Sequence, residues 1–413
     1  MKKLLVLGAG TAGTIIANKL RKRLSKADWS ITVVDRDDSH VYQPGFLFVP
    51  FEVAPPDLHR SRRQTLDRDV ELVLGEIDRL RPMDHQVDLE SGVTLEYDYV
   101  VVATGTSPRP DQTPGMLGSE WRRSVFDFYT LDGAAALRQA LTGFDHGSLV
   151  VHVTEMPIKC PVAPLEFAFL AEAWLRARGL RDRVEIVFVT PQPGAFTRPV
   201  ASKRLGQMLD ERKIALETDF AIDRIEPDTK TLVSYDEREV PFDLLVTVPV
   251  NMGADFVGRS GLGDELNYVG VDRFTLRSKA HDDVFAVGDA NDIPTSKAGS
   301  VAHYSAEVFV DNFLQVAAGR EPTHRFDGHA NCFIETGDNK ALLIDFNYET
   351  EPLPGKYPLP VLGPLDLLKE SRANHAGKLA FRWMYWNVLL PGRPLPLPNH
   401  MSMVGKTTVT EED

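Results

Sequence analysis

The residue best placed for chemistry is a cysteine between a predicted strand and a predicted helix. Cys160 follows the apolar run 148–153 and precedes the segment 167–178, whose apolar residues repeat at helical spacing. A thiol near the N-terminus of a helix has its thiolate stabilised. Cys160 is therefore placed to act as a nucleophile or an electron donor.

The turn that carries Cys160 also lacks the glycines of a dinucleotide-binding motif. In proteins with two dinucleotide-binding domains, the second strand-to-helix turn normally holds glycines that let the backbone approach a pyrophosphate. The stretch 154–166 contains no glycine, and the strand predicted at 184–190 runs into Pro191 without an acid to hold a ribose. We therefore do not expect a nicotinamide cofactor at this site.

The N-terminus does carry a complete dinucleotide-binding pattern. A buried-strand run at 3–7 leads into Gly8-Ala-Gly10-Thr-Ala-Gly13, a helix through Leu24 and a second strand that ends at Asp35. Gly8 makes the turn, Gly10 admits the pyrophosphate, Gly13 packs helix on strand, and Asp35 takes a ribose hydroxyl. A glycine-rich turn that arose by chance would not be flanked by this strand, this helix and the acidic residue at the end of the second strand. The predicted dinucleotide ligands here are Gly8, Gly10, Thr11, Ala12, Gly13, Asp35 and Arg36.

Two later turns extend the predicted cofactor site. The strand run 95–103 ends at Thr104-Gly105, and the run 283–287 ends at Gly288-Asp289, both patterns typical of flavoproteins. A lone buried carboxylate at Asp289 would be costly without a hydroxyl-rich ligand. A helix predicted from 295 to 313 could direct its free N–H groups at a flavin pyrimidine. The remaining predicted ligands are Pro44, Ile77, Lys297 and Gly299, although Lys297 could equally be a solvated lysine.

Composition bounds the class of protein. A chain of 413 residues is long enough for two or three domains, and 43% hydrophobic with 25% charged residues describes a soluble globular protein. The net charge of −13 argues against a nucleic-acid partner. Only two cysteines are present, so neither a disulfide framework nor a metal-ligand pattern is expected. The apolar N-terminal run stops at Gly8, so we expect no signal peptide, and no apolar stretch is long enough to span a bilayer.

The C-terminal region contains the second cysteine and an aromatic stripe. Cys332 lies in a predicted strand, and a second predicted strand covers 341–346. Further on, Leu379, Trp383, Trp386 and Leu390 repeat at helical spacing, with the basic residues Lys378, Arg382 and Arg393 opposite them. Three aromatic residues within 383–386 rarely all find core partners, which favours a membrane-interface segment over a core-packed terminal helix.

These patterns predict an α/β protein with two Rossmann-like domains and a small C-terminal α+β region that ends in an amphipathic helix. We expect the FAD-binding domain to comprise residues 1–107 and 281–323. The second Rossmann-like domain would span 108–280 and carry Cys160, and the continuous apolar runs 149–153, 184–189 and 244–248 would be its parallel strands. The C-terminal region, 324–413, would carry Cys332 and form the interface with a membrane and a lipid-soluble electron acceptor, which the resemblance given next implies is a quinone.

The chain resembles the sulfide:quinone oxidoreductase family, within the disulfide-reductase flavoproteins. The residues that carry the resemblance are Gly8 to Gly13, Ala103 to Gly105, Cys160 followed by Glu166, Gly288-Asp289, Lys297 to Gly299, Cys332 and the aromatic C-terminus. In that family two cysteines form a disulfide or polysulfide bridge beside FAD. The resemblance implies that Cys160 and Cys332 are this catalytic pair and that Glu166 is an acid/base. A helix-start carboxylate that satisfies the dipole is the alternative role of Glu166.

The resemblance also implies the substrates and the location. Sulfide would reduce FAD through the cysteine pair, a quinone would take the electrons, and the product would be sulfane sulfur or polysulfide. A third cysteine of many members, expected near 124–130, is absent, so FAD is predicted to be non-covalent. The protein would be a peripheral protein on the cytoplasmic face of a membrane, and it could form a homo-oligomer.

Three alternatives stay open. The first is the flavoprotein subunit of a flavocytochrome-type sulfide dehydrogenase, which would be exported. The second is a type II NADH:quinone dehydrogenase, which needs the glycines missing around Cys160. The third is a non-catalytic redox sensor that binds FAD and switches partners through its thiols.

Overall fold

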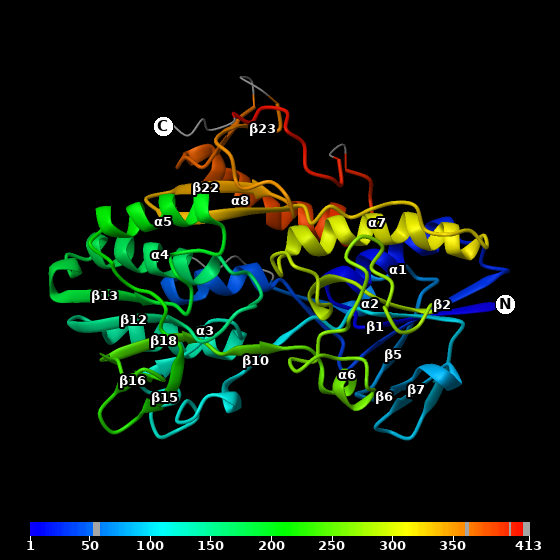
Figure 1. Ribbon diagram of the computed structural model, residues 1–413, viewed down its shortest axis with the longest axis horizontal. Coiled ribbons are helices and arrows are strands. Elements are labelled where there is room, and N and C mark those ends of the chain that lie inside the picture. Colours follow the sequence, from blue (N-terminus) through cyan, green and yellow to red (C-terminus); the bar gives the residue numbers. More distant parts are fainter. Residues whose placement is uncertain (53–57, 360–362, 396–397, 408–413) are drawn as a thin grey trace.

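The computed structural model describes residues 1–52, 58–359, 363–395 and 398–407. Two lobes lie side by side, each built on a five-stranded parallel sheet, and a C-terminal layer lies along one side of both lobes (Figure 1). This arrangement confirms the expected α/β fold with two Rossmann-like units and a C-terminal α+β part that ends in a helix.

The first lobe holds the sheet β20-β9-β1-β2-β5, in which every pairing is parallel. Figure 1 shows α1 and α7 on one side of this sheet and the antiparallel sheet β6-β7-β8 on the other. The bounds are β1 (Lys2–Leu7), α1 (Thr11–Arg23), β2 (Trp29–Asp35), β5 (Glu71–Leu74), β6 (Ile77–Arg81), β7 (Gln86–Leu89), β8 (Thr94–Glu96), β9 (Tyr99–Val102), β20 (Val284–Ala286) and α7 (Gly299–Ala317). Because β1 is central, the loops after β1, β2, β9 and β20 meet at one edge, where open parallel sheets bind ligands.

The second lobe repeats the plan with the sheet β11-β18-β12-β13-β14. The apolar runs predicted as strands at 149–153, 184–189 and 244–248 form its centre. The bounds are β11 (Val125–Phe126), α3 (Leu131–Gly143), β12 (Gly147–Val153), α4 (Ala163–Ala177), β13 (Val184–Val189), α5 (Pro199–Glu211), β14 (Ala215–Glu217), β15 (Ile222–Glu226), β16 (Thr231–Ser234), β17 (Glu239–Pro241) and β18 (Leu244–Val248).

Shorter elements join and complete the two lobes. The ribbon of β10 and β19 passes between the lobes (Figure 1). The bounds are β3 (Ser39–Val41), the 3-10 helix η1 (Gln43–Phe51), β4 (His59–Ser61), α2 (Arg62–Thr65), η2 (Pro82–Asp84), β10 (Ser107–Arg109), η3 (Pro110–Gln112), η4 (Arg181–Arg183), β19 (Val250–Met252), α6 (Asp255–Arg259) and η5 (Gly288–Ala290).

The C-terminal layer connects the lobes through a four-stranded sheet, β21-β22-β24-β23. Strands β21 (Ala330–Gly337) and β22 (Lys340–Phe346) form a hairpin whose turn residues, Asp338 and Asn339, have φ of 53° and 57°, as a type I′ turn requires. The remaining bounds are β23 (Gly355–Tyr357), β24 (Leu365–Leu367), α8 (Arg372–Met384) and the π-helical turn η6 (Tyr385–Leu389). A Cβ added at Gly337 would lie 2.5 Å from Ala173 Cβ, so β21 packs closely on α4.

The predicted aromatic stripe of the last helix is divided in the structure. Leu379 and Trp383 are 54% and 65% exposed, whereas Trp386 and Leu390 are buried against the first lobe. Lys378, predicted on the solvent side, is instead paired with the buried Glu166. Tyr385 and Trp386 therefore find core partners and Trp383 does not, so the three aromatic residues do not all pack in the core, as expected. In the described part of the chain, no helix is long and apolar enough to cross a bilayer.

Candidate active site

The glycine loop after β1 has the geometry that a bound pyrophosphate needs. Gly8 has φ of +102°, and a Cβ there would lie 2.5 Å from the carbonyl oxygen of Ala103. A Cβ on Gly13 would lie 1.9 Å from the carbonyl oxygen of Gly8, whereas no atom lies within 4 Å of the corresponding point at Gly10. The open side of Gly10 and the uncapped first turn of α1, which contains Thr11 and Ala12, leave space and N–H groups for an anion.

Replacing Gly13 by alanine should remove flavin from the protein. The added Cβ would meet backbone 1.9 Å away, so the loop between Gly8 and Gly13 must shift out of its binding geometry. The flavin-to-protein absorbance ratio of purified Gly13→Ala should fall to a small fraction of the wild-type ratio. Gly206→Ala is the matched control, because nothing lies within 4 Å of its Cβ and a helical alanine adds roughly 0.5–1 kcal/mol of stability. Full flavin content in Gly13→Ala would contradict the assigned role of the loop.

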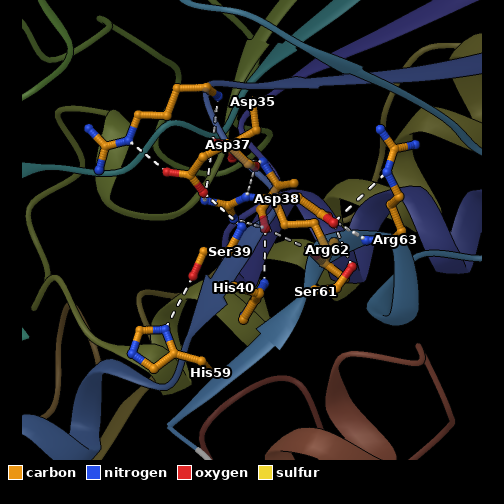
Figure 2. Close-up of polar contacts among 12 residues, drawn as sticks. Asp35, Asp37, Asp38, Ser39, His40, His59, Ser61, Arg62 and Arg63 are labelled. Carbon is orange, nitrogen blue, oxygen red and sulfur yellow. Dashed lines mark hydrogen bonds and ion pairs between the residues drawn. The ribbon is translucent and has the colours of Figure 1, made fainter.

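Asp35 stands at the end of β2, and an arginine fixes its orientation. Its carboxylate accepts the N–H of Ala9 at 2.7 Å and that of Arg36 at 2.8 Å, and it pairs with Arg62 at 3.1 Å. Figure 2 shows Arg62 beside Asp35 and Asp37. Burial raises the pKa of Asp35, although Arg62 opposes this shift. The Arg36 side chain is largely exposed and contributes here only its backbone N–H.

The turn after β9 contains an unsatisfied polar atom. Thr104 Oγ1 is buried, and no hydrogen-bond partner for it exists in the described part of the chain. Gly105, next in sequence, has φ of +69° and completes the turn. A buried hydroxyl without a partner is costly, so a ligand group that bonds to Thr104 is the physical explanation.

Asp289 and two lysines form a buried charged group at the end of β20. Gly288 has φ of +73° and turns the chain into Asp289. Burial raises the pKa of Asp289, and the charges of Lys297 and Lys159 oppose the shift. Lys297 donates to the carbonyl oxygens of Asp289 and Asn291, at 3.0 and 2.8 Å, and burial lowers its pKa to about 8. The solvated alternative for Lys297 was therefore wrong.

These residues fit a flavin dinucleotide. The open glycine loop, the carboxylate of Asp35, the orphaned Thr104 hydroxyl and the Asp289 carboxylate all follow strands of one parallel sheet. Helix α7 begins at Gly299, two residues beyond Lys297. Of the other predicted ligands, Pro44 is exposed in the first turn of η1, and Ile77 is half-buried at the start of β6.

The C-terminal layer reaches this loop through Tyr385. Its hydroxyl lies 2.7 Å from His40 Nε2 and 2.8 Å from Thr11 Oγ1, while His40 Nδ1 lies 3.0 Å from the carbonyl oxygen of Ala9. Burial lowers the pKa of His40 to about 4. His40 is therefore neutral, donates from Nδ1 to the carbonyl and accepts the Tyr385 proton. The π turn thus holds the dinucleotide loop from outside.

Cys160 occupies a strained backbone position between the two lobes. Its φ is +49°, which non-glycine residues rarely adopt and which clusters at functional sites. Its N–H donates to the carbonyl oxygen of Lys297 at 2.6 Å, and its own carbonyl accepts from Tyr129 Oη at 3.0 Å. These bonds fix Cys160 beside the loop that carries Lys297.

The expected stabilisation of the Cys160 thiolate was wrong. Burial and the nearby Glu166 carboxylate raise the pKa of Cys160 to about 12, and the ammonium of Lys378 only partly offsets them. A helix N-terminus stabilises an anion by a few kcal/mol at most, whereas desolvation can shift a pKa by several units. Cys160 also lies three residues before the first residue of α4.

Cys332 approaches the same site from β21. Burial raises its pKa, and the charges of Cys160 and Glu166 add to the shift, so the two thiols interact electrostatically. Both thiols are free in this structure. Residues 172 positions apart in sequence are thus brought together because β21 packs on α4.

Glu166 lies between the two elements that carry the cysteines. Its side chain is 1% exposed, and its Oε1 accepts the N–H of Glu335 on β21 at 2.7 Å and an ammonium hydrogen of Lys378 on α8. Burial raises the pKa of Glu166, as predicted for a buried carboxylate near a thiolate, and Lys378 opposes the shift. The carboxylate therefore binds neighbouring elements in addition to lying in the first turn of its own helix.

Sequence reasoning missed several residues of the site. Arg62, His40, Tyr385 and Lys159 were not assigned to it, and Lys378 was placed on the solvent face. A basic residue directly before Cys160 was a usable signal for Lys159. The other four reach the site from distant segments, and no local pattern marks them.

Comparisons with known proteins agree with this geometry. Residues 2–307 match the model of the pyridine nucleotide-disulphide oxidoreductase family. The mitochondrial sulfide:quinone oxidoreductase of Mus musculus is 25% identical over 94% of this chain and 86% of its own length. That of Dictyostelium discoideum is 26% identical over 95% of this chain and 86% of its own length. The crystal structure of the sulfide:quinone oxidoreductase from Aquifex aeolicus superposes with a TM-score of 0.80 at 21% identity, covering 95% of this chain and 92% of that one. The chain therefore belongs to the pyridine nucleotide-disulphide oxidoreductase family.

Proposed function

We propose that this protein is a FAD-dependent sulfide:quinone oxidoreductase. The observation that carries the proposal is the group of Cys160, Cys332 and Glu166, in which Cys160 occupies the strand-to-helix turn where a nicotinamide fingerprint would otherwise stand. Relatives named for this activity match nearly the whole chain, which supports the same assignment.

The residues around the carboxyl edge of the first sheet would hold FAD. These are Gly8, Gly10, Thr11, Ala12, Gly13, Asp35, Arg36, Pro44, Ile77, Thr104, Gly105, Gly288, Asp289, Lys297 and Gly299. Bound there, FAD would supply a two-electron acceptor that passes reducing equivalents to a quinone.

The cysteine pair would carry the sulfur chemistry. In the oxidised enzyme Cys160 and Cys332 form a disulfide or polysulfide bridge. Hydrosulfide attacks one sulfur of this bridge, and the bond between the two breaks, which leaves a persulfide on one cysteine and a thiolate on the other. Loss of two electrons, to the acceptor that FAD would supply, and of one proton then joins the persulfide and the thiolate in a bridge that holds the added sulfur. Attack on this bridge by a further nucleophile such as hydrosulfide would restore the cysteine pair and release the added sulfur as sulfane sulfur or polysulfide.

Glu166 is placed to move the accompanying proton. Its raised pKa brings the carboxyl nearer to neutral pH, where an acid/base works best. The ammonium of Lys378 lies beside it and balances negative charge formed at the thiols.

Anaerobic addition of sulfide to the purified protein tests the proposal. The flavin absorbance should bleach with sulfide and return on addition of a soluble quinone, while NADH in a parallel cuvette should leave it unchanged. Bleaching by NADH alone would identify a type II NADH:quinone dehydrogenase. Sulfide bleaching that only a cytochrome reverses would favour the flavocytochrome-type subunit, and no turnover with either reductant would favour a redox sensor.

The flavin is predicted to be non-covalent. The only cysteines are Cys160 and Cys332, and none lies in 124–130. Acid or heat precipitation should therefore release the flavin into the supernatant, where its absorbance can be measured. Flavin that stays with the precipitated polypeptide would contradict this prediction.

The exposed half of the aromatic stripe is proposed to bind a membrane surface. Among the described residues, the C-terminal part of the chain has five exposed large apolar side chains: Leu359, Leu379, Trp383, Met403 and Val404. The double substitution Leu379→Ser, Trp383→Ser should reduce co-flotation with lipid vesicles severalfold while soluble-quinone activity is kept. Leu117→Ser, on the second lobe and 52% exposed, is the matched control. Unchanged flotation of the double variant would place the membrane contact elsewhere.

A further inference from the structure

A line of four ionisable side chains leads from the thiol pair to the protein surface. Glu166 and Glu335 are buried, with side chains 1% and 2% exposed. Lys378 is 13% exposed, and His375, at the outer end, is 20% exposed. His375, at the solvent end, is therefore the most exposed of the four, and Glu166, at the thiol end, is the most buried.

Two pairs along this line are in direct contact, Lys378 with Glu166 and His375 with Glu335, whereas Lys378 and Glu335 interact through their charges. Lys378 Nζ donates to Glu166 Oε1 and, at 3.3 Å, to the carbonyl oxygen of Phe333. The carboxylates of Glu166 and Glu335 together raise the pKa of Lys378, although burial acts to lower it. His375 Nδ1 lies 2.9 and 3.0 Å from the two carboxylate oxygens of Glu335.

Three elements hold the line together. His375 and Lys378 are one turn apart on α8, so both side chains leave the same face of that helix. This face packs against the hairpin of β21 and β22, and β21 carries Glu335. The N–H of Glu335 also donates to Glu166 on α4, at 2.7 Å.

We propose that His375 and Glu335 form the outer half of a proton path that joins solvent to Lys378 and Glu166 beside the thiol pair. This inference rests on the proposed function. Oxidation of hydrosulfide to sulfane sulfur releases two electrons and one proton, and reduction of a quinone to a quinol takes up two electrons and two protons. The proton of hydrosulfide is therefore released beside the thiol pair. Glu166 takes it up, Lys378 and Glu335 pass it on, and His375 delivers it to solvent.

Chemical rescue tests the path. His375→Ala should lower the rate of sulfide-dependent quinone reduction roughly a hundredfold, the lower end of the range for proton transfer by a positioned side chain. Added imidazole should restore much of the rate, and a series of substituted imidazoles should rescue in the order of their pKa values. His146→Ala is the matched control, because His146 is an exposed histidine that pairs with Asp145 in the second lobe. Its rate should be unchanged with or without imidazole.

Glu335→Gln adds a second readout. This variant should be slow, should not respond to imidazole, and should show an increased solvent isotope effect on kcat. A wild-type rate in His375→Ala, or a loss that imidazoles restore without regard to their pKa, would overturn the proton path. Absence of sulfide-dependent quinone reduction in the wild type would overturn the proposed function instead, so the two failures are distinguishable.

Discussion

Replacement of Cys160 or Cys332 by serine is expected to slow sulfide-dependent flavin bleaching at least about a hundredfold. A hydroxyl cannot form the bridge that hydrosulfide attacks, nor carry a persulfide. Serine is close to cysteine in size, so the packing of α4 on β21 should be kept. Stopped-flow absorbance after anaerobic mixing with sulfide measures the loss for each variant.

Dithionite provides the control for this experiment. It reduces flavins without a thiol intermediate, so it should bleach both variants as fast as the wild type. If one variant keeps the wild-type rate with sulfide, that cysteine is not part of the relay. Loss of dithionite reduction in a variant would instead point to a displaced flavin.

The fold could be predicted well because its signals are local. Glycines that tolerate no Cβ mark the turn at Gly8 and the helix contact at Gly13, and Asp35 follows at the end of the next strand. Continuous apolar runs identified β12, β13 and β18, because strands covered on both faces need no polar residues. Each of these patterns lies within a few residues of the structure that it specifies.

The C-terminal helix shows where local patterns fail. A helical wheel placed Trp383 and Trp386 on one stripe with Lys378 opposite. In the structure, the π turn pairs the N–H of Leu390 with the carbonyl of Tyr385, five residues earlier. This extra residue per turn rotates the later side chains toward the first lobe. The stripe is therefore divided between the core and the surface.

The site could be predicted only where a motif marks it. Cys160 was identified from its place between a strand and a helix, whereas its pairing with Cys332 and the role of Glu166 were predicted from the resemblance to a family. Arg62 and Lys378 were not, because long side chains from other segments reach the site only in the folded chain. The same limit explains why the raised pKa of Cys160 was not predicted. Position before a helix is visible in sequence, whereas burial next to a carboxylate is not.

The buried pair of Glu166 and Lys378 provides the second large effect. Removal of one partner leaves the other charge in a low-dielectric site, which typically costs about 3–5 kcal/mol. Lys378→Met should therefore lower the free energy of unfolding by about 3 kcal/mol. Glu166 then faces Glu335 with no ammonium between them, so burial and repulsion raise its pKa further.

The pH dependence of the stability of Lys378→Met separates the effect of the lost charge from the effect of the changed packing. A carboxyl whose pKa is raised in the folded state binds its proton more tightly there than in the unfolded chain. Stability is then lost as pH rises from the unfolded pKa of Glu166 through its raised folded pKa. Urea unfolding midpoints of Lys378→Met should fall over this acidic-to-neutral window, more steeply than those of the wild type. The double variant Glu166→Gln, Lys378→Met removes both charges and keeps an acceptor for the Glu335 N–H, so it should regain most of the loss and show little pH dependence. Equal, pH-independent losses in the single and double variants would mean that Lys378 contributes through packing alone.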